Sequence, residues 1–189
     1  FKYGKKIKIN SPKDAAFHGI GLIPEERKTQ GIIPEMSVKE NITITILDKI
    51  NKLGFFDNEK EKNIANKLVD DLNIKTSGLD QHSKNLSGGN QQKVVLAKWF
   101  AKNGDILIFD EPTRGIDVGA KLEIYNLMNE FAGQKKGVIM ISSEIEEVLN
   151  MSDRILVIDE GKLLTELSPS EASKEKIMQH IIGKKEVSE

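Results

Sequence analysis

Leu86-Ser87-Gly88-Gly89-Asn90-Gln91-Gln92-Lys93, together with the later stretch Ile106-Leu107-Ile108-Phe109-Asp110-Glu111-Pro112, decides the fold of this chain. The first stretch places a hydroxyl and two glycines directly before a run that is typical of a helix, and Ser87 is a good N-cap for it. Glycines allow backbone N–H groups to come close to a ligand, and a helix N-terminus favours phosphate. This stretch therefore indicates a phosphate-binding helix start.

The second stretch consists of four apolar residues followed by two carboxylates. It predicts a buried parallel strand with its acids at the carboxyl end, where α/β sheets bind ligands. Asp110 could hold the Mg²⁺ of a bound nucleotide, and Glu111 could accept a proton from water.

Composition limits the class of protein. The length of 189 residues suits one domain, and the balance of 28 basic against 29 acidic residues gives no support for a nucleic-acid or membrane-surface polycation. The chain has no cysteine, so it has no disulfide framework. No apolar run approaches the roughly 20 residues that span a bilayer. The chain begins at Phe1 and not at Met, so we expect it to be a piece of a longer protein.

Strands and helices alternate in the first part of the chain, which favours an α/β fold. We expect a short strand within residues 1–10, a helix after Ser11 and a buried strand over Ile20-Gly21-Leu22-Ile23. A charged loop follows over residues 25–36. Ser37-Val38-Lys39-Glu40 is a capping box that predicts the next helix.

The same alternation continues to the end of the chain. We expect helices over residues 58–72 and 88–102, and a helix after Asp117 with the apolar stripe Val118, Leu122, Tyr125 and Met128. A strand over 138–141 and a strand pair turned by Glu160-Gly161 come next. Ser168-Pro169-Ser170-Glu171 predicts the start of a terminal helix.

Three motifs in this order resemble those of ABC ATPases. Leu86–Gln91 resembles their signature motif, Ile106–Glu111 their Walker B strand and Gly115-Ile116-Asp117 their D-loop. A lone Ser-Gly-Gly is common in loops, whereas the three motifs at this spacing are specific. The wording of Asn90–Lys93 and of Glu111–Lys121 is similar to the ATP-binding subunits of ribose-, galactose- and xylose-type sugar importers. The resemblance is to the second of their two nucleotide-binding domains and covers nearly the whole chain.

The resemblance implies a fold and a division of the chain. The fold is α/β: a partial P-loop NTPase core with a mostly parallel sheet and an inserted helical subdomain. Residues 1–36 and 103–189 would belong to the core, and residues 37–102 to the helical subdomain, whose groove receives a coupling helix of the membrane permease.

The resemblance also implies roles for named residues. In the family, two nucleotide-binding domains enclose two ATP molecules head to tail. The residues that would touch ATP held by the first domain of the same full-length chain are Ser87, Gly88, Gly89 and Gln91. Asp110 would hold Mg²⁺, Glu111 would polarise the attacking water, and Asp117 would link the two sites.

Two positions depart from the family pattern. Glu25 stands where the Q-loop has Gln, and it is open whether it binds a metal-bound water or is a solvated loop acid. Ser143 stands where a catalytic His is usual, and it can hydrogen-bond phosphate but cannot carry a positive charge. We hypothesise that the signature serves a competent site on the first domain, while the chain's own site is slow or structural.

The phosphate-binding loop Gly-x-x-x-x-Gly-Lys-[Ser/Thr] is absent from the sequence. We therefore expect this chain alone to bind negligible ATP and to be inactive.

The resulting hypothesis is an ATP-hydrolysing subunit of a monosaccharide importer. It would work on the inner, cytoplasmic face of the membrane with permease subunits and, indirectly, a sugar-binding protein, and without nucleic acid. The alternatives are a catalytically degenerate regulatory domain, favoured by Glu25 and Ser143 but not by Glu111, and a non-transport ABC-type ATPase.

Overall fold

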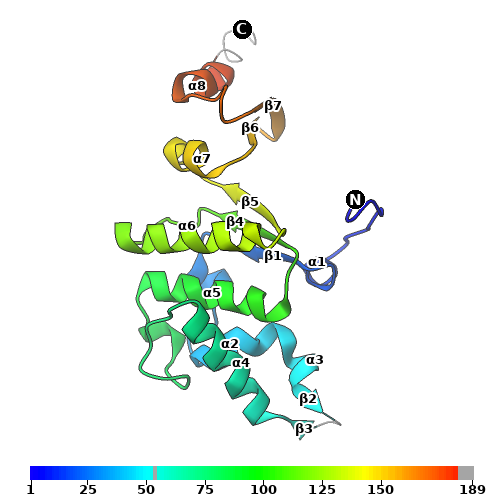
Figure 1. Ribbon diagram of the computed structural model, residues 1–189, viewed down its shortest axis with the longest axis vertical. Helices are drawn as coiled ribbons and strands as arrows, with labels where there is room; N and C mark the ends of the chain where they lie inside the picture. The colour runs from blue at the N-terminus through cyan, green and yellow to red at the C-terminus, as the bar shows by residue number, and fades with distance from the viewer. Residues whose placement is uncertain (53–54, 183–189) are drawn as a thin grey trace. The chain divides into compact units, whose positions relative to one another are not determined.

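The computed structural model describes residues 1–52 and 55–182 (Figure 1). The chain divides into two compact units, Phe1–Ile139 and Met140–Glu189, which are described separately.

The three predicted core strands form one sheet. Its order is β1 (Ile20–Ile23), β4 (Ile106–Asp110) and β5 (Gly137–Ile141). β1 and β4 are parallel, with Ile20 opposite Ile106. Side chains alternate across a strand, so one face carries Ile23, Leu107 and Phe109, all fully buried. The expected α/β fold is confirmed.

Helix α5 (Gly88–Lys102) is the centre of the first unit (Figure 1). It contacts β1 and α6 on one side and α2 and α4 on the other. Trp99 of α5 packs over Gly21, and its indole N–H donates to the backbone oxygen of Leu22 at 2.8 Å. Phe100 stacks on Phe131 with ring centroids 5.4 Å apart. The long helix thus joins the sheet to the helical segment that precedes it.

The segment between β1 and β4 is mainly helical. Its elements are α2 (Val38–Thr43), the 3₁₀ turn Ile44–Ile46, α3 (Leu47–Ile50), the short pair β2 (Asn51–Lys52) and β3 (Phe55–Phe56), α4 (Asn58–Asp71) and the 3₁₀ turn Ser83–Asn85. The capping box at α2 is confirmed, because Ser37 accepts from the Glu40 N–H and the Glu40 carboxylate accepts from the Ser37 N–H.

A buried asparagine that the sequence did not single out ties this segment together. The Asn41 amide donates to the backbone oxygens of Ile33, Met36 and Ser37 and to the Ser83 hydroxyl, and it accepts from the Ile33 N–H at 2.7 Å. Such a satisfied buried amide fixes the path of the loop before α2.

The first residues correct one expectation. No strand forms within residues 1–10, because Tyr3 and Gly4 have positive φ and turn the chain back, which leaves a single isolated β-bridge between Lys2 and Lys5. The expected helix is confirmed as α1 (Pro12–Phe17), with Ser11 accepting from the Asp14 N–H. Arg27–Gly31 forms a π-helical turn within the expected loop.

Helix α6 (Val118–Gly133) begins after Asp117 as expected, but its buried face overlaps the predicted stripe only in part. Val118 and Leu122 are 77% and 59% exposed. The buried residues are Ile124, Leu127, Met128 and Phe131. Of the predicted stripe only Met128 is buried and Tyr125 is half-buried. Apolar residues lie on two adjacent faces of this helix, so the spacing alone did not show which face packs.

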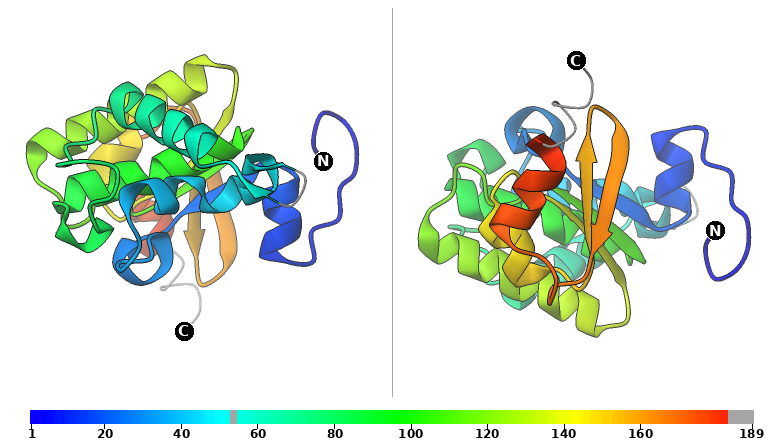
Figure 2. Two further views of the ribbon diagram at one scale, coloured as in Figure 1. Left: turned by 90° about the horizontal axis from the view of Figure 1, so that it is seen from below. Right: turned by 90° about the horizontal axis from the view of Figure 1, so that it is seen from above.

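The second unit contains α7 (Ile145–Met151), the antiparallel pair β6 (Ile155–Asp159) and β7 (Lys162–Leu167), and α8 (Lys174–Ile182). The strand pair turned by Glu160-Gly161 is confirmed, with positive φ at both residues. Figure 2 shows α8 beside this pair, where Ile177 joins a core with Ile155, Val157 and Leu167.

The predicted helix start at Ser168 is wrong. The Ser168 N–H and hydroxyl both donate to the Glu171 carboxylate and close a separate turn, and the helix begins only at Lys174.

Among the residues that the structure describes, no helix is both long enough and apolar enough to cross a membrane.

Candidate functional site

Ser87 caps α5 and is itself oriented by Asn90. The Ser87 hydroxyl oxygen accepts from the Asn90 side-chain N–H₂ at 2.9 Å and, more weakly, from the Asn90 backbone N–H at 3.4 Å. The Asn90 oxygen accepts from the Lys75 N–H at 2.8 Å, which fixes the orientation of the amide. With its lone pairs engaged, the exposed Ser87 hydroxyl can donate its proton to an incoming anion. Asn90 was not among the predicted site residues, although its place three residues after the N-cap could have indicated a role.

Gly88 and Gly89 sit where a side chain would require neighbouring atoms to shift. A Cβ on Gly88 would lie 2.6 Å from an Arg27 nitrogen, and one on Gly89 would lie 2.9 Å from the Ala120 Cβ. The start of α5 is therefore packed closely against the segment after β1 and the first turn of α6.

Gln91 lies apart from Ser87. Its side chain is buried and donates to the Ser83 backbone oxygen at 3.1 Å, while its own oxygen has no partner among the described residues. The structure directs this amide into the helical segment, and its predicted contact with ATP stays a prediction.

Asp110 ends β4 at the carboxyl edge of the sheet, and Glu111 follows it directly. Both are half-buried. Glu111 has φ of +46°, a left-handed backbone that non-glycine residues rarely adopt and that is concentrated at functional sites. The Arg114 backbone N–H donates to the Glu111 backbone oxygen at 3.1 Å and closes the turn.

Glu25 faces the same turn. Its carboxylate forms an ion pair with the Arg114 guanidinium. The Arg27 guanidinium donates to the backbone oxygens of Arg114 at 3.1 Å and Gly115 at 3.3 Å. These contacts bring the predicted Q-loop position and the predicted D-loop together.

Asp117 is the N-cap of α6. Its exposed carboxylate accepts from the Ala120 N–H at 2.9 Å. Its predicted role between two sites stays a prediction. Ser143 follows β5 in the second unit.

The described ranges 1–52 and 55–182 contain no group of three or more acidic, His or Cys side chains suited to hold an ion. Asp110 alone fits Mg²⁺ that arrives with nucleotide phosphates, because such Mg²⁺ needs only one or two protein carboxylates and keeps several waters.

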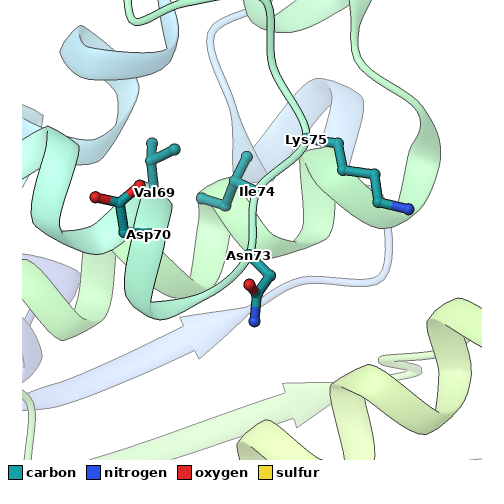
Figure 3. A pocket seen from close by; sticks show the side chains of 5 residues that line it. All are labelled: Val69, Asp70, Asn73, Ile74 and Lys75. Atoms are coloured by element: carbon teal, nitrogen blue, oxygen red, sulfur yellow. The ribbon is translucent and has the colours of Figure 1, made fainter.

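A shallow pocket of about 430 Å³ lies elsewhere in the first unit, after α4 (Figure 3). Its lining residues are Val69, Asp70, Asn73, Ile74 and Lys75. None of the predicted site residues lines this pocket. Two of its lining residues do contact α5: the Lys75 backbone N–H donates to the Asn90 side-chain oxygen, and the Asn73 backbone oxygen accepts from the Lys93 ammonium group.

Comparison with known proteins gives the family. The sequence model described as ABC transporter matches residues 4–114, more than half of the chain. The chain is 53% identical over 182 residues to the xylose import ATP-binding protein XylG of Thermoanaerobacter pseudethanolicus, a match that covers 96% of this chain and 36% of that protein. It is 50% identical over 180 residues to the ribose import ATP-binding protein RbsA of Geobacillus kaustophilus, covering 95% of this chain and 36% of that protein. The chain thus spans about a third of the length of these relatives.

A solved structure supports the fold. The ATP-binding cassette MJ0796, in a dimeric post-hydrolysis state bound to ADP and Pi, matches with a TM-score of 0.70 and 21% identity. The match covers 86% of this chain and 68% of that chain. With the signature-like helix start, the acidic strand end and the family match in agreement, the chain belongs to the ABC transporter family.

Proposed function

We propose that this chain is part of the ATP-hydrolysing subunit of an importer for monosaccharides. The relatives that match nearly all of its length are import proteins for xylose and ribose. The observation that carries the proposal is the joint presence, in one compact unit, of the Ser87-Gly88-Gly89 helix start and the Asp110-Glu111 strand end.

The chemistry follows from the site. The Ser87 hydroxyl and the free N–H groups at the start of α5 bind phosphate oxygens of an ATP held by the first nucleotide-binding domain. Asp110 would hold Mg²⁺, which would neutralise phosphate charge. Glu111 accepts a proton from the attacking water, a role that is worth roughly 10²–10⁴-fold in rate.

The finer assignments extend this proposal. The chain is the second nucleotide-binding domain, works at the cytoplasmic face of the membrane beside permease subunits, and depends on a sugar-binding protein for its substrate. On its own it is inactive, because the sequence lacks the phosphate-binding loop that would hold the β- and γ-phosphates. Glu25 and Ser143 favour a slower reaction at the chain's own site than at the site that its signature completes.

Steady-state ATP hydrolysis by the intact gene product tests the proposal. Ser87→Arg places a bulky side chain where phosphate binds and should remove most of the activity. Ser11→Arg is the matched control, because Ser11 is also a helix N-cap but lies outside the site, and it should leave the rate unchanged. An intact product that does not hydrolyse Mg·ATP, or equal rates in both variants, would refute the proposal.

A further inference from the structure

Two side chains from the segment after β1 hold the turn after β4. Glu25 pairs with the side chain of Arg114, and Arg27 donates to the backbone oxygens of Arg114 and Gly115. Arg114 is therefore held through its side chain and its backbone at once. We call these contacts of Glu25 and Arg27 the 25–27 clamp.

The clamp touches both halves of the candidate site. A Cβ on Gly88 would lie 2.6 Å from the Arg27 Nη2 and 3.6 Å from the Gly115 oxygen. Arg27 thus fills the space between the start of α5 and the turn that leads to Asp117. Arg27 therefore contacts the turn that leads to Asp117 and lies close to the start of α5.

The turn itself depends on this support. Glu111 has a left-handed backbone, which is strained for a residue other than glycine. The Arg114 N–H donates to the Glu111 backbone oxygen, so Arg114 and Glu111 belong to one hydrogen-bonded turn.

Stability alone does not account for the clamp. The Arg114 side chain is 66% exposed, and an exposed ion pair contributes little to stability. The Arg27 Nε is buried without a partner among the described residues, which is unfavourable. A contact that adds little stability but fixes the spacing of site elements is suited to positioning.

We propose that Glu25 and Arg27 are positioning residues for ATP hydrolysis, and that they hold the turn Glu111–Asp117 at the correct distance from the start of α5. The inference rests on the proposed function. It assigns the acid at the Q-loop position to Arg114 instead of to a metal-bound water.

The test uses the intact gene product and separates kcat from KM. Arg27→Met removes both donors and should lower kcat about tenfold, while KM for ATP changes less than about twofold because the phosphate-binding loop is unaltered. The kcat of Arg27→Lys should lie between those of the wild type and Arg27→Met, because one ammonium group cannot reproduce the two donors of the planar guanidinium group.

A charge exchange tests the ion pair. Glu25→Arg and Arg114→Glu should each lower kcat about threefold, and the double variant should recover most of the wild-type value. The exchange of Glu35 and Lys84, an exposed pair at 2.7 Å that lies outside the candidate site, is the control and should leave kcat unchanged.

Melting temperatures should stay within a few degrees of wild type for all of these variants. If Arg27→Met does not fold, the kcat values of Arg27→Lys and of the charge-exchange variants test the clamp instead. A wild-type kcat in Arg27→Met, or in Arg27→Lys and both single charge variants, would overturn the clamp while the proposed function stands. A double variant that stays as slow as its parents would also overturn it. An intact wild-type product without Mg·ATP hydrolysis would instead refute the proposed function, and the clamp with it.

Discussion

Lys93 of α5 and Glu123 of α6 form an ion pair of 2.7 Å whose two ends lie in different surroundings. The Lys93 side chain is 4% exposed, whereas that of Glu123 is 51% exposed. Lys93 also donates to the Asn73 backbone oxygen at 2.8 Å. The pair therefore joins α5, α6 and the segment after α4 around one buried ammonium group.

This asymmetry predicts unequal effects of removing either partner. Glu123→Gln leaves a buried ammonium without its counter-charge and should lower the free energy of unfolding by about 2 kcal/mol. Lys93→Met leaves only a solvated carboxylate and a carbonyl of an exposed residue, so it should cost about 1 kcal/mol or less. Urea unfolding of the intact protein measures both free-energy changes. A larger loss for Lys93→Met than for Glu123→Gln would show that the buried charge does not determine the effect.

Gly21 should not tolerate a methyl group. A Cβ there would lie 2.5 Å from Trp99 Cδ2 and 2.8 Å from a methyl carbon of Leu107. Gly21→Ala should therefore lower the free energy of unfolding by about 1–3 kcal/mol and displace the Trp99 ring. Thermal unfolding and tryptophan fluorescence would detect this change.

Gly133→Ala is the matched control for Gly21→Ala. Gly133 ends α6, and a Cβ there would meet nothing within 4 Å. We expect this substitution to be neutral or to stabilise by up to about 1 kcal/mol. Equal destabilisation by both alanines would mean that the Trp99 contact is not the cause.

The capping box at α2 predicts a pH-dependent effect. Hydrogen bonds from the Ser37 hydroxyl and the Ser37 backbone N–H lower the pKa of Glu40 below its ordinary value of 4.5. A lowered pKa in the folded state stabilises the protein above pH 4.5, and this stabilisation is lost as the pH falls through the folded-state pKa. Ser37→Ala should cost about 1 kcal/mol at pH 7.

The cost of Ser37→Ala should shrink as Glu40 becomes protonated. Unfolding curves of both proteins at pH 7 and between pH 4.5 and 3 measure this difference. A cost that stays constant across that range would show that Glu40 does not contribute through its charge.

The sequence predicted the elements whose evidence is local. The strand ending at Asp110 was visible as an unbroken apolar run, and the helix after Ser87 as a cap followed by a helical pattern. The stripe of α6 was predicted only in part, because Val118 and Leu122 have the correct spacing but lie on the exposed face. Choosing between two apolar faces requires knowledge of what packs against the helix.

The site contacts were harder to predict, because they join residues that are distant in sequence. Arg27 and Arg114 are separated by 87 positions, and no local pattern indicates their contact. Asn41 and Ser83 are 42 positions apart. Motif spacing could identify Ser87, Asp110 and Glu111 as candidates, but not the side chains that hold them in place.

The most direct test of the account is ATP-dependent uptake of labelled monosaccharides by liposomes that contain the intact gene product and its permease, with the cognate sugar-binding protein outside. We predict uptake of a pentose or hexose that requires ATP inside the liposomes and that falls to background with Ser87→Arg but not with Ser11→Arg. ATP hydrolysis without uptake of ribose, xylose or galactose, or uptake that is unchanged by Ser87→Arg, would contradict the role in sugar import.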